Sequence, residues 1–310
     1  MDARYQSLPA PELSLARLTS KRLDAKGLLL HGVLLVSLIA SVGVLVVLLV
    51  TVFGGGWRVI VDRGWGFVHA SLSSLPELAG VWQGVVGSAL LMLFVVAVSF
   101  PLGIAAAVYL EEYARDNRVS RFINVNVRNL AGVPSIVYGL LGVAVFVELL
   151  KGATGGPSVI SGGLTLAILV LPIVIITSAE ALRAVPVAIR EAGYGVGATR
   201  WQVIRSHVLP SAVPGILTGT ILSLSRALGE TAPLLLVGAV TGYLTLGNQG
   251  LMAQLKGQFT TLPTIIFAWA TLPNANFRAL TSAAIIVLLT VILLANATAI
   301  VLRNRYARRS

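Results

Sequence analysis

The sequence is poor in the residues that build most catalytic and metal sites. It contains no cysteine and only three histidines among 310 residues. The lack of cysteine excludes disulfides, thiolate metal sites and a cysteine nucleophile. The scattered histidines form neither a metal-ligand pattern nor a Ser-His-Asp arrangement. No G-x-x-x-x-G-K-[ST] motif is present, which excludes ATP binding through a P-loop. We therefore expect a chain that is not an enzyme by itself and holds no metal.

Charged residues are also scarce, at 11% of the chain, against about 25% in an ordinary soluble domain. Hydrophobic residues make up 56%, and the mean hydropathy is +0.88. Six apolar segments reach or exceed the roughly 20 residues that a helix needs to cross a bilayer. They lie near 28–53, 84–110, 129–150, 159–182, 213–240 and 278–302. The sequence thus predicts an all-α integral membrane protein, a single domain over 28–302 whose six transmembrane helices contact membrane lipid.

The distribution of Lys and Arg predicts the orientation of these helices. The net charge of +11 could suggest a nucleic-acid partner, but the basic residues flank apolar spans, so no nucleic acid is expected. Of the 23 Lys and Arg residues, 17 fall in four segments and five on the opposite side of the spans. The four segments are the tail 1–27, the loops 111–128 and 183–212, and the tail 303–310. Because basic residues concentrate on the cytoplasmic side, both termini are predicted to be cytoplasmic. No cleavage site precedes the first span, which therefore resembles an uncleaved signal anchor.

Four smaller features carry expectations for the structure. The 54–80 loop is expected to be a short external excursion, and 241–277 to contain an interfacial or re-entrant helix. Proline inside a helix removes a hydrogen-bond donor, so Pro134 and Pro172 are expected to kink the spans that hold them. The adjacent carboxylates Glu111 and Glu112 are expected to form a solvated turn.

The loop 183–212 is long for a link between two membrane helices. Pro186 suits the first turn of a helix, the glycines of "GYGVG" break the chain, and Thr199 could cap a second helix. Apolar residues at three- and four-residue spacing form a stripe on that second helix, namely Trp201, Ile204 and Val208. Two interpretations stay open: an amphipathic helix on the membrane surface, or a docking element for a soluble partner.

This loop resembles the EAA signature of bacterial ABC-importer permeases. The matching residues are Glu191, Ala192, Gly193, Gly197, Leu209 and Pro210. The resemblance implies a coupling helix that seats in a groove of a cytoplasmic ATPase, with Trp201 and Arg205 as further coupling residues. The chain departs from the pattern at Gly193, where the family usually has alanine, and at His207, where an aliphatic residue is common. Both departures could alter the fit to the ATPase.

Two more stretches narrow the resemblance. "LAGVPSIVYGLLG" (130–142) and "LSRALGETAPLLLVGA" (224–239) are similar to phosphate-specific permeases of the PstA type, and the similarity runs from about residue 84 onward. It implies a type I ABC importer permease fold in the bacterial inner membrane and a role in phosphate import. The implied partners are a homologous permease of the PstC type, an ATPase dimer of the PstB type that binds ATP and Mg, and a phosphate-binding protein of the PstS type. This chain would itself bind no cofactor.

Two other functions remain open at this point. The same architecture could carry another oxyanion, such as molybdate or sulfate. A secondary transporter or channel that works without ATP is the other alternative.

The most unusual feature of the apolar spans is the pair Arg226 and Glu230. A charge at mid-span costs roughly 2.5–3.5 kcal/mol on insertion scales, so the fifth span needs a reason to keep two. An unbroken helix would place them on one stripe with Gly215, Gly219, Ser223 and Pro233. Three interpretations are open: a structural pair, a pathway contact in which Arg226 with Ser223 meets an anion while Glu230 moderates the charge, or a pair across a subunit interface.

Overall fold

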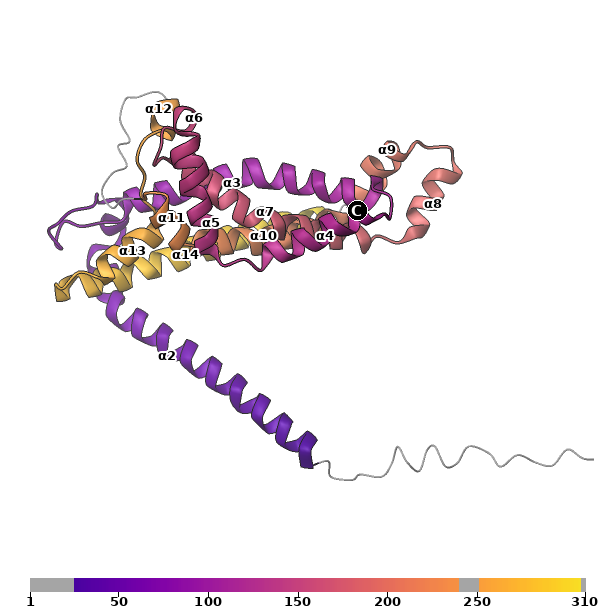
Figure 1. Cartoon of the computed structure of the whole chain (residues 1–310). Coiled ribbons are helices and arrows are strands. Elements are labelled where there is room, and N and C mark those ends of the chain that lie inside the picture. The colour runs from indigo at the N-terminus through magenta and orange to yellow at the C-terminus, as the bar shows by residue number, and fades with distance from the viewer. Residues whose placement is uncertain (1–24, 240–250, 308–310) are drawn as a thin grey trace, which may run out of the picture. The chain divides into compact units, whose positions relative to one another are not determined.

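The computed structural model describes residues 25–239 and 251–307, and every regular element in these ranges is helical (Figure 1). The chain divides into two compact units, Met1–Thr51 and Val52–Ser310. Helix α2 (Ala25–His69) begins in the first unit, where its residues 26–48 are all exposed. Parts of three expected segments lie outside the described residues: the tail 1–27 up to residue 24, 240–250 of the fifth span and the loop that follows it, and the last three residues of 303–310.

The second unit contains α-helices interrupted by three short π-helices, written η1 to η3. In chain order these are α3 (Trp82–Val108), η1 (Tyr109–Tyr113), α4 (Arg118–Ala131), α5 (Ser135–Gly142), η2 (Val143–Leu149), α6 (Lys151–Thr154), α7 (Val159–Arg183), α8 (Val187–Gly195), α9 (Arg200–Val203), η3 (Ile204–Val208), α10 (Leu209–Gly229), α11 (Ala232–Leu236), α12 (Leu251–Leu255), α13 (Leu262–Ala270) and α14 (Ala275–Ala307).

The membrane spans follow the apolar runs of the sequence. Among the described residues, five helices are long and apolar enough to cross a membrane, and α4 with α5 and η2 makes a sixth if this pair is one span. The pair is bent by 100°. The predicted all-α membrane fold is confirmed, while the side on which the termini lie stays a prediction.

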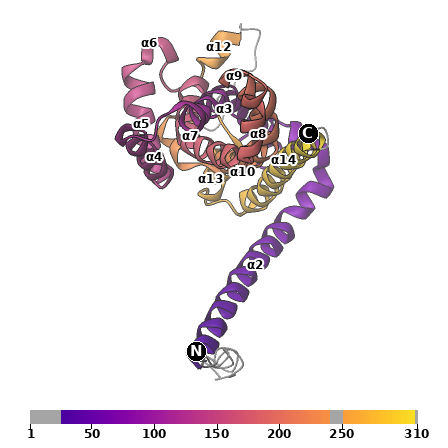
Figure 2. The same ribbon diagram turned by 90° about the vertical axis from the view of Figure 1, so that its right-hand side faces the viewer.

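The core of the unit is formed where α7 packs between α3 and α10. Gly219 of α10 lies so close to α7 that an added Cβ would overlap Thr177, and a Cβ on Gly215 would lie 2.7 Å from the Ala181 Cβ. The small residues on this face of α10 therefore allow it to pack closely against α7. Seen end-on, α4 and α5 flank α7 on one side, and α14 flanks α10 on the other (Figure 2).

Two prolines act differently from one another. Pro134 does more than kink a span: α4 ends at Ala131, and α5 begins after Pro134, which has extended backbone (ψ 137°). A residue that precedes proline is pushed out of the helical region, so the chain breaks here. Pro172 instead lies inside α7, which continues through it.

The helix that carries Arg226 ends earlier than an unbroken 213–240 span would. Helix α10 runs from Leu209 to Gly229, and Glu230 has extended backbone with ψ 116°. Pro233 lacks a backbone N–H, and its ring would clash with the carbonyl of residue 229 in a continuous helix. The stripe inferred for an unbroken helix therefore holds up to Arg226 and is wrong for Glu230 and Pro233.

The short helix expected within 241–277 is α13. Thr261 and Thr264 form a capping box at its start, and its first four residues are buried: Leu262, Pro263, Thr264 and Ile265. Because an amphipathic surface helix would leave one face exposed, this burial favours a helix packed within the bundle.

Candidate functional site

The segment between α7 and α10 forms two short helices and a sharp glycine break, as the sequence predicts. Pro186 is the N-cap of α8, one position before the expected first turn. Gly197 has φ +80°, a conformation that glycine adopts without steric cost. Thr199 caps α9 through a capping box with Gln202, whose Oε1 accepts from the Thr199 amide at 2.8 Å. We call residues 184–208 the coupling segment.

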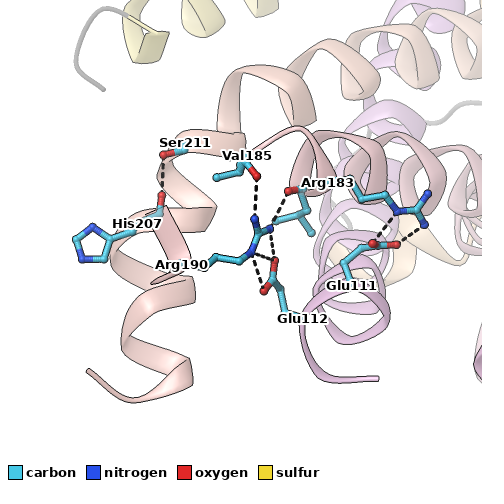
Figure 3. Close-up of polar contacts among 8 residues, drawn as sticks. Glu111, Glu112, Arg183, Val185, Arg190, His207 and Ser211 are labelled. Atoms are coloured by element: carbon cyan, nitrogen blue, oxygen red, sulfur yellow. Dashed lines mark hydrogen bonds and ion pairs between the residues drawn. The ribbon is translucent and has the colours of Figure 1, made fainter. Parts of the chain in front are cut away.

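The coupling segment is anchored by an ion pair with the end of the second span (Figure 3). Arg190 on α8 donates from Nη2 to Oε1 of Glu112 at 2.6 Å and from Nε at 3.2 Å. The same guanidinium donates to the carbonyls of Val185 at 2.8 Å and Leu182 at 2.9 Å. The Glu112 side chain is only 5% exposed. This one arginine therefore ties α8 to both η1 and the end of α7.

A second ion pair lies beside the first. Arg183, the last residue of α7, donates from Nε to Glu111 Oε2 at 2.7 Å and from Nη2 to Oε1. The expected solvated turn at Glu111 and Glu112 is therefore wrong, because η1 lies against the end of α7 and both carboxylates meet arginines there. Arg183 is 72 residues from Glu111, and Arg190 is 78 residues from Glu112. Pairs this far apart in the sequence cannot be predicted from the spacing of neighbouring residues.

The predicted apolar stripe of the coupling segment divides between core and surface. Ile204 and Val208 are fully buried, whereas Trp201 is 53% exposed. Gly193 is buried, and an added Cβ would lie 2.7 Å from the Val203 Cγ2. This close approach gives a physical reason for glycine at the position where the resembling family usually has alanine.

The remaining predicted coupling residues are mostly on the surface. Glu191, Ala192, Gly197, Arg205 and Pro210 are exposed, and Leu209 is half-buried. Exposed apolar side chains accompany them: Val187, Tyr194, Val196 and Trp201. Figure 1 places α8 and α9 together beyond one end of the long helices of the second unit. Such side chains beyond the spans form a surface suited to a protein partner.

The pair Arg226 and Glu230 is looser than the Arg190 pair. Arg226 Nε donates to Glu230 Oε1 at 3.3 Å, and the two side chains are 43% and 17% exposed. Ser223 is fully buried, and its hydroxyl donates to the Gly219 carbonyl at 2.8 Å. The structure therefore brings Arg226 and Glu230 together and places Ser223 in the packed part of α10.

Comparison with known proteins decides the family. Residues 99–308 match the model of the binding-protein-dependent transport system inner membrane component. The chain belongs to this family. It is 37% identical over 220 residues to the phosphate transport system permease protein PstA of Yersinia pestis, covering 70% of each chain. It is also 37% identical over 252 residues to PstA 1 of Mycobacterium tuberculosis (strain CDC 1551 / Oshkosh), covering 80% of this chain and 79% of that one.

The fold also matches solved members of this class. A crystal structure of a bacterial alginate ABC transporter, in complex with a pentasaccharide-bound periplasmic protein, aligns with a TM-score of 0.61 at 16% identity. The alignment covers 89% of this chain and 93% of that one. The expected type I ABC importer permease fold is confirmed. This membrane component is a multi-pass transport subunit, and its described residues hold no cluster of three or more His, Asp or Glu that could bind a metal ion.

Proposed function

We propose that this chain is the membrane-spanning permease subunit of an ATP-driven importer of inorganic phosphate in the bacterial inner membrane. The observation that carries the proposal is its 37% identity to PstA permeases over most of both chains. The segment 224–239, which holds Arg226 and Glu230, lies within the family match. The cytoplasmic location of both termini, inferred from the Lys and Arg distribution, is part of the same proposal.

The energy would come from a separate ATPase dimer that binds ATP and Mg. A homologous permease of the PstC type would complete the translocation path, and a phosphate-binding protein of the PstS type would deliver the anion outside. Support for an ATPase partner comes from the exposed apolar side chains of the coupling segment, because hydrophobic and aromatic residues at a surface favour docking.

The geometry of the coupling segment supports a mechanical role. Arg190 holds α8 against Glu112 and against two carbonyls at the end of α7. A displacement of α8 by the ATPase would therefore move the ends of the second and fourth spans together with it. That movement is a rigid-body change between two states of the bundle. The coupling contacts would come from Glu191, Ala192, Gly193, Gly197, Trp201, Arg205, Leu209 and Pro210.

Arg226 would contact phosphate transiently during passage. A guanidinium presents paired donors that match a tetrahedral oxyanion, and this one has a single contact of 3.3 Å to lose. Glu230 would moderate the positive charge, so that the anion is released rather than trapped. The full burial of Ser223 argues against a direct contact between its hydroxyl and the anion.

The test is ATP-dependent uptake of radiolabelled phosphate into vesicles that carry the whole complex. Uptake should persist under excess sulfate and molybdate and should stop when the ATPase is catalytically inactive. Uptake that continues without ATP hydrolysis would contradict an ABC mechanism. If molybdate or sulfate competes with phosphate for uptake, the substrate would be assigned as that oxyanion instead of phosphate.

A further inference from the structure

Helix α4 is unusually polar for part of a membrane span. Together with α5 and η2 it is long and apolar enough to form one bent span, yet none of its residues is buried. Three arginines and three asparagines lie within its 14 residues: Arg118, Arg121, Asn124, Asn126, Arg128 and Asn129. Most of these residues belong to the 111–128 segment predicted to lie on the cytoplasmic side, where such side chains can meet water or protein, since they are too costly to face hydrocarbon.

Contacts with α7 place α4 beside that span. Asn124, Val127 and Arg128 share a small pocket with Ile175 and other residues of α7 up to Arg183. Figures 1 and 2 both show α4 running next to α7, and in Figure 1 it extends from α5 toward the end that carries α8 and α9. The eight steps from Ile175 to Arg183 rise about 12 Å along a helix, so α4 covers the last two turns of α7.

One flank of α4 lines an open pocket of about 550 Å³ that is rich in arginine. Four arginines contribute to it: Arg115, Arg121, Arg128 and Arg183. Ser120 and Asn124 add neutral polar groups, and Glu111 and Asp116 add two carboxylates. Glu180 lines the small neighbouring pocket. The four guanidinium groups therefore exceed the carboxylates at this end of the bundle.

The four arginines differ in how far they are neutralised. Arg183 is engaged with Glu111, and Arg121 has an exposed contact of 3.5 Å to Asp116. Across residues 25–239 and 251–307, no carboxylate lies within ion-pair distance of Arg115 or Arg128, and neither side chain has a recorded hydrogen bond. These two guanidinium groups are free to bind an anion from solution.

The α4 side of the pocket is joined to α5 by one hydrogen bond. Tyr138 on α5 donates its hydroxyl to the Leu130 carbonyl at 2.9 Å. Leu130 is two residues from Arg128, and Arg121 follows two turns further along α4, about 10 Å away. Arg128 and Arg121 therefore extend positive charge along α4 from near its junction with α5 toward the end that carries the coupling segment.

We propose that this pocket binds a phosphate group, as the inorganic anion on its way from Arg226 to the cytoplasm, with Arg115 and Arg128 as its main contacts. The inference rests on the proposed function and extends it to the exit side of the path. Paired guanidinium groups suit a phosphate oxyanion, and clustered charge in a pocket raises the local anion concentration. A phospholipid headgroup offers the same chemistry, so the test separates the two sources.

The first arm measures phosphate uptake by the whole complex in vesicles. The double variant Arg115→Gln/Arg128→Gln should slow uptake about tenfold, with the half-saturating external phosphate concentration unchanged. Arg128→Lys should retain most of the rate. Arg118→Gln is the matched control, because Arg118 lies on α4 but outside the pocket, and its uptake should equal wild type.

The second arm measures binding without transport. The chain has no cysteine, so Asn124→Cys provides a unique reporter in the pocket wall. Inorganic phosphate should slow its modification by a negatively charged thiol reagent, and the double arginine substitution should abolish that protection. This binding measurement can be made even if the wild-type complex imports no phosphate. Such a lack of import would contradict the proposed function without testing the pocket.

Three results would overturn the proposal. The first is full uptake by the double variant, and the second is labelling of Asn124→Cys that phosphate does not slow. The third is protection that appears in phosphatidylglycerol vesicles, is absent in phosphatidylcholine vesicles and does not respond to inorganic phosphate. That last pattern would assign the pocket to a lipid headgroup.

Discussion

Two Arg–Glu pairs in this molecule have the same chemistry and different surroundings. Arg190 makes bonds to Glu112 and to two backbone carbonyls, and the Glu112 side chain is 5% exposed. Among the described residues, Arg226 has one hydrogen bond, of 3.3 Å to Glu230, and these side chains are 43% and 17% exposed. A largely buried pair with several hydrogen bonds holds elements in place, whereas a more exposed pair with spare donors can exchange partners. The difference is consistent with the proposed roles, a mechanical one for the first pair and an anion contact for the second.

The largest expected effect on stability comes from breaking the buried pair. Glu112→Gln would leave the Arg190 guanidinium buried without a counter-charge, a loss of about 3–5 kcal/mol. Thermal unfolding of the purified complex should show a clear drop in the midpoint. Asp116→Asn is the matched control, because Asp116 is 89% exposed and its contact to Arg121 is 3.5 Å. Equal effects of the two substitutions would contradict the structural role given to Glu112.

The next effect concerns the packing of α10 on α7. Gly219→Ala would force a Cβ into Thr177, and overpacking of this kind costs about 1–3 kcal/mol. Gly229→Ala adds the same group where no atom lies within 4 Å, so thermal unfolding should be unchanged or slightly delayed. A Gly219→Ala protein as stable as wild type would show that the two helices are further apart than the structure has them.

A smaller effect is expected at the start of α9. Thr199→Ala removes the side-chain cap that bonds Gln202, which is typically worth about 1 kcal/mol. Hydrogen exchange of the amides of residues 200–203 should become faster. Ser206→Ala, at an exposed position on η3, should leave that exchange unchanged. Unchanged exchange in Thr199→Ala would show that the start of α9 is stabilised by neighbouring contacts and not by the Thr199 cap.

The smallest effect on stability is expected for the exposed pair. A double-mutant cycle with Arg226→Gln and Glu230→Gln should give a coupling free energy of unfolding below about 1 kcal/mol, as is typical of polar contacts within membrane helix bundles. A coupling of several kcal/mol, close to that of a buried pair, would make Arg226 and Glu230 a structural element and remove the distinction between the two pairs.

Local signals in the sequence predicted much of the fold. The apolar runs located the spans, and Thr199 located the start of α9, because both signals depend on neighbouring residues. The early end of α10 was harder to predict: Pro233 disfavours a helix that continues through residue 229, but α7 continues through Pro172, so a proline alone does not locate a helix end. The pair Arg190 and Glu112 could not be found in this way. Its partners are 78 residues apart, and they meet only when α8 folds back on η1.

The most direct measurement of the central claim is phosphate uptake by the Arg226→Gln complex, made beside thermal unfolding of the same preparation. The account predicts an unfolding midpoint close to wild type and an uptake rate lower by about tenfold or more, as expected for a lost charge-assisted contact to the passing anion. For Glu112→Gln the account predicts the opposite pattern, in which the main effect is a lower unfolding midpoint. Wild-type uptake by an assembled Arg226→Gln complex would contradict the account, because the exposed pair would then have no part in transport.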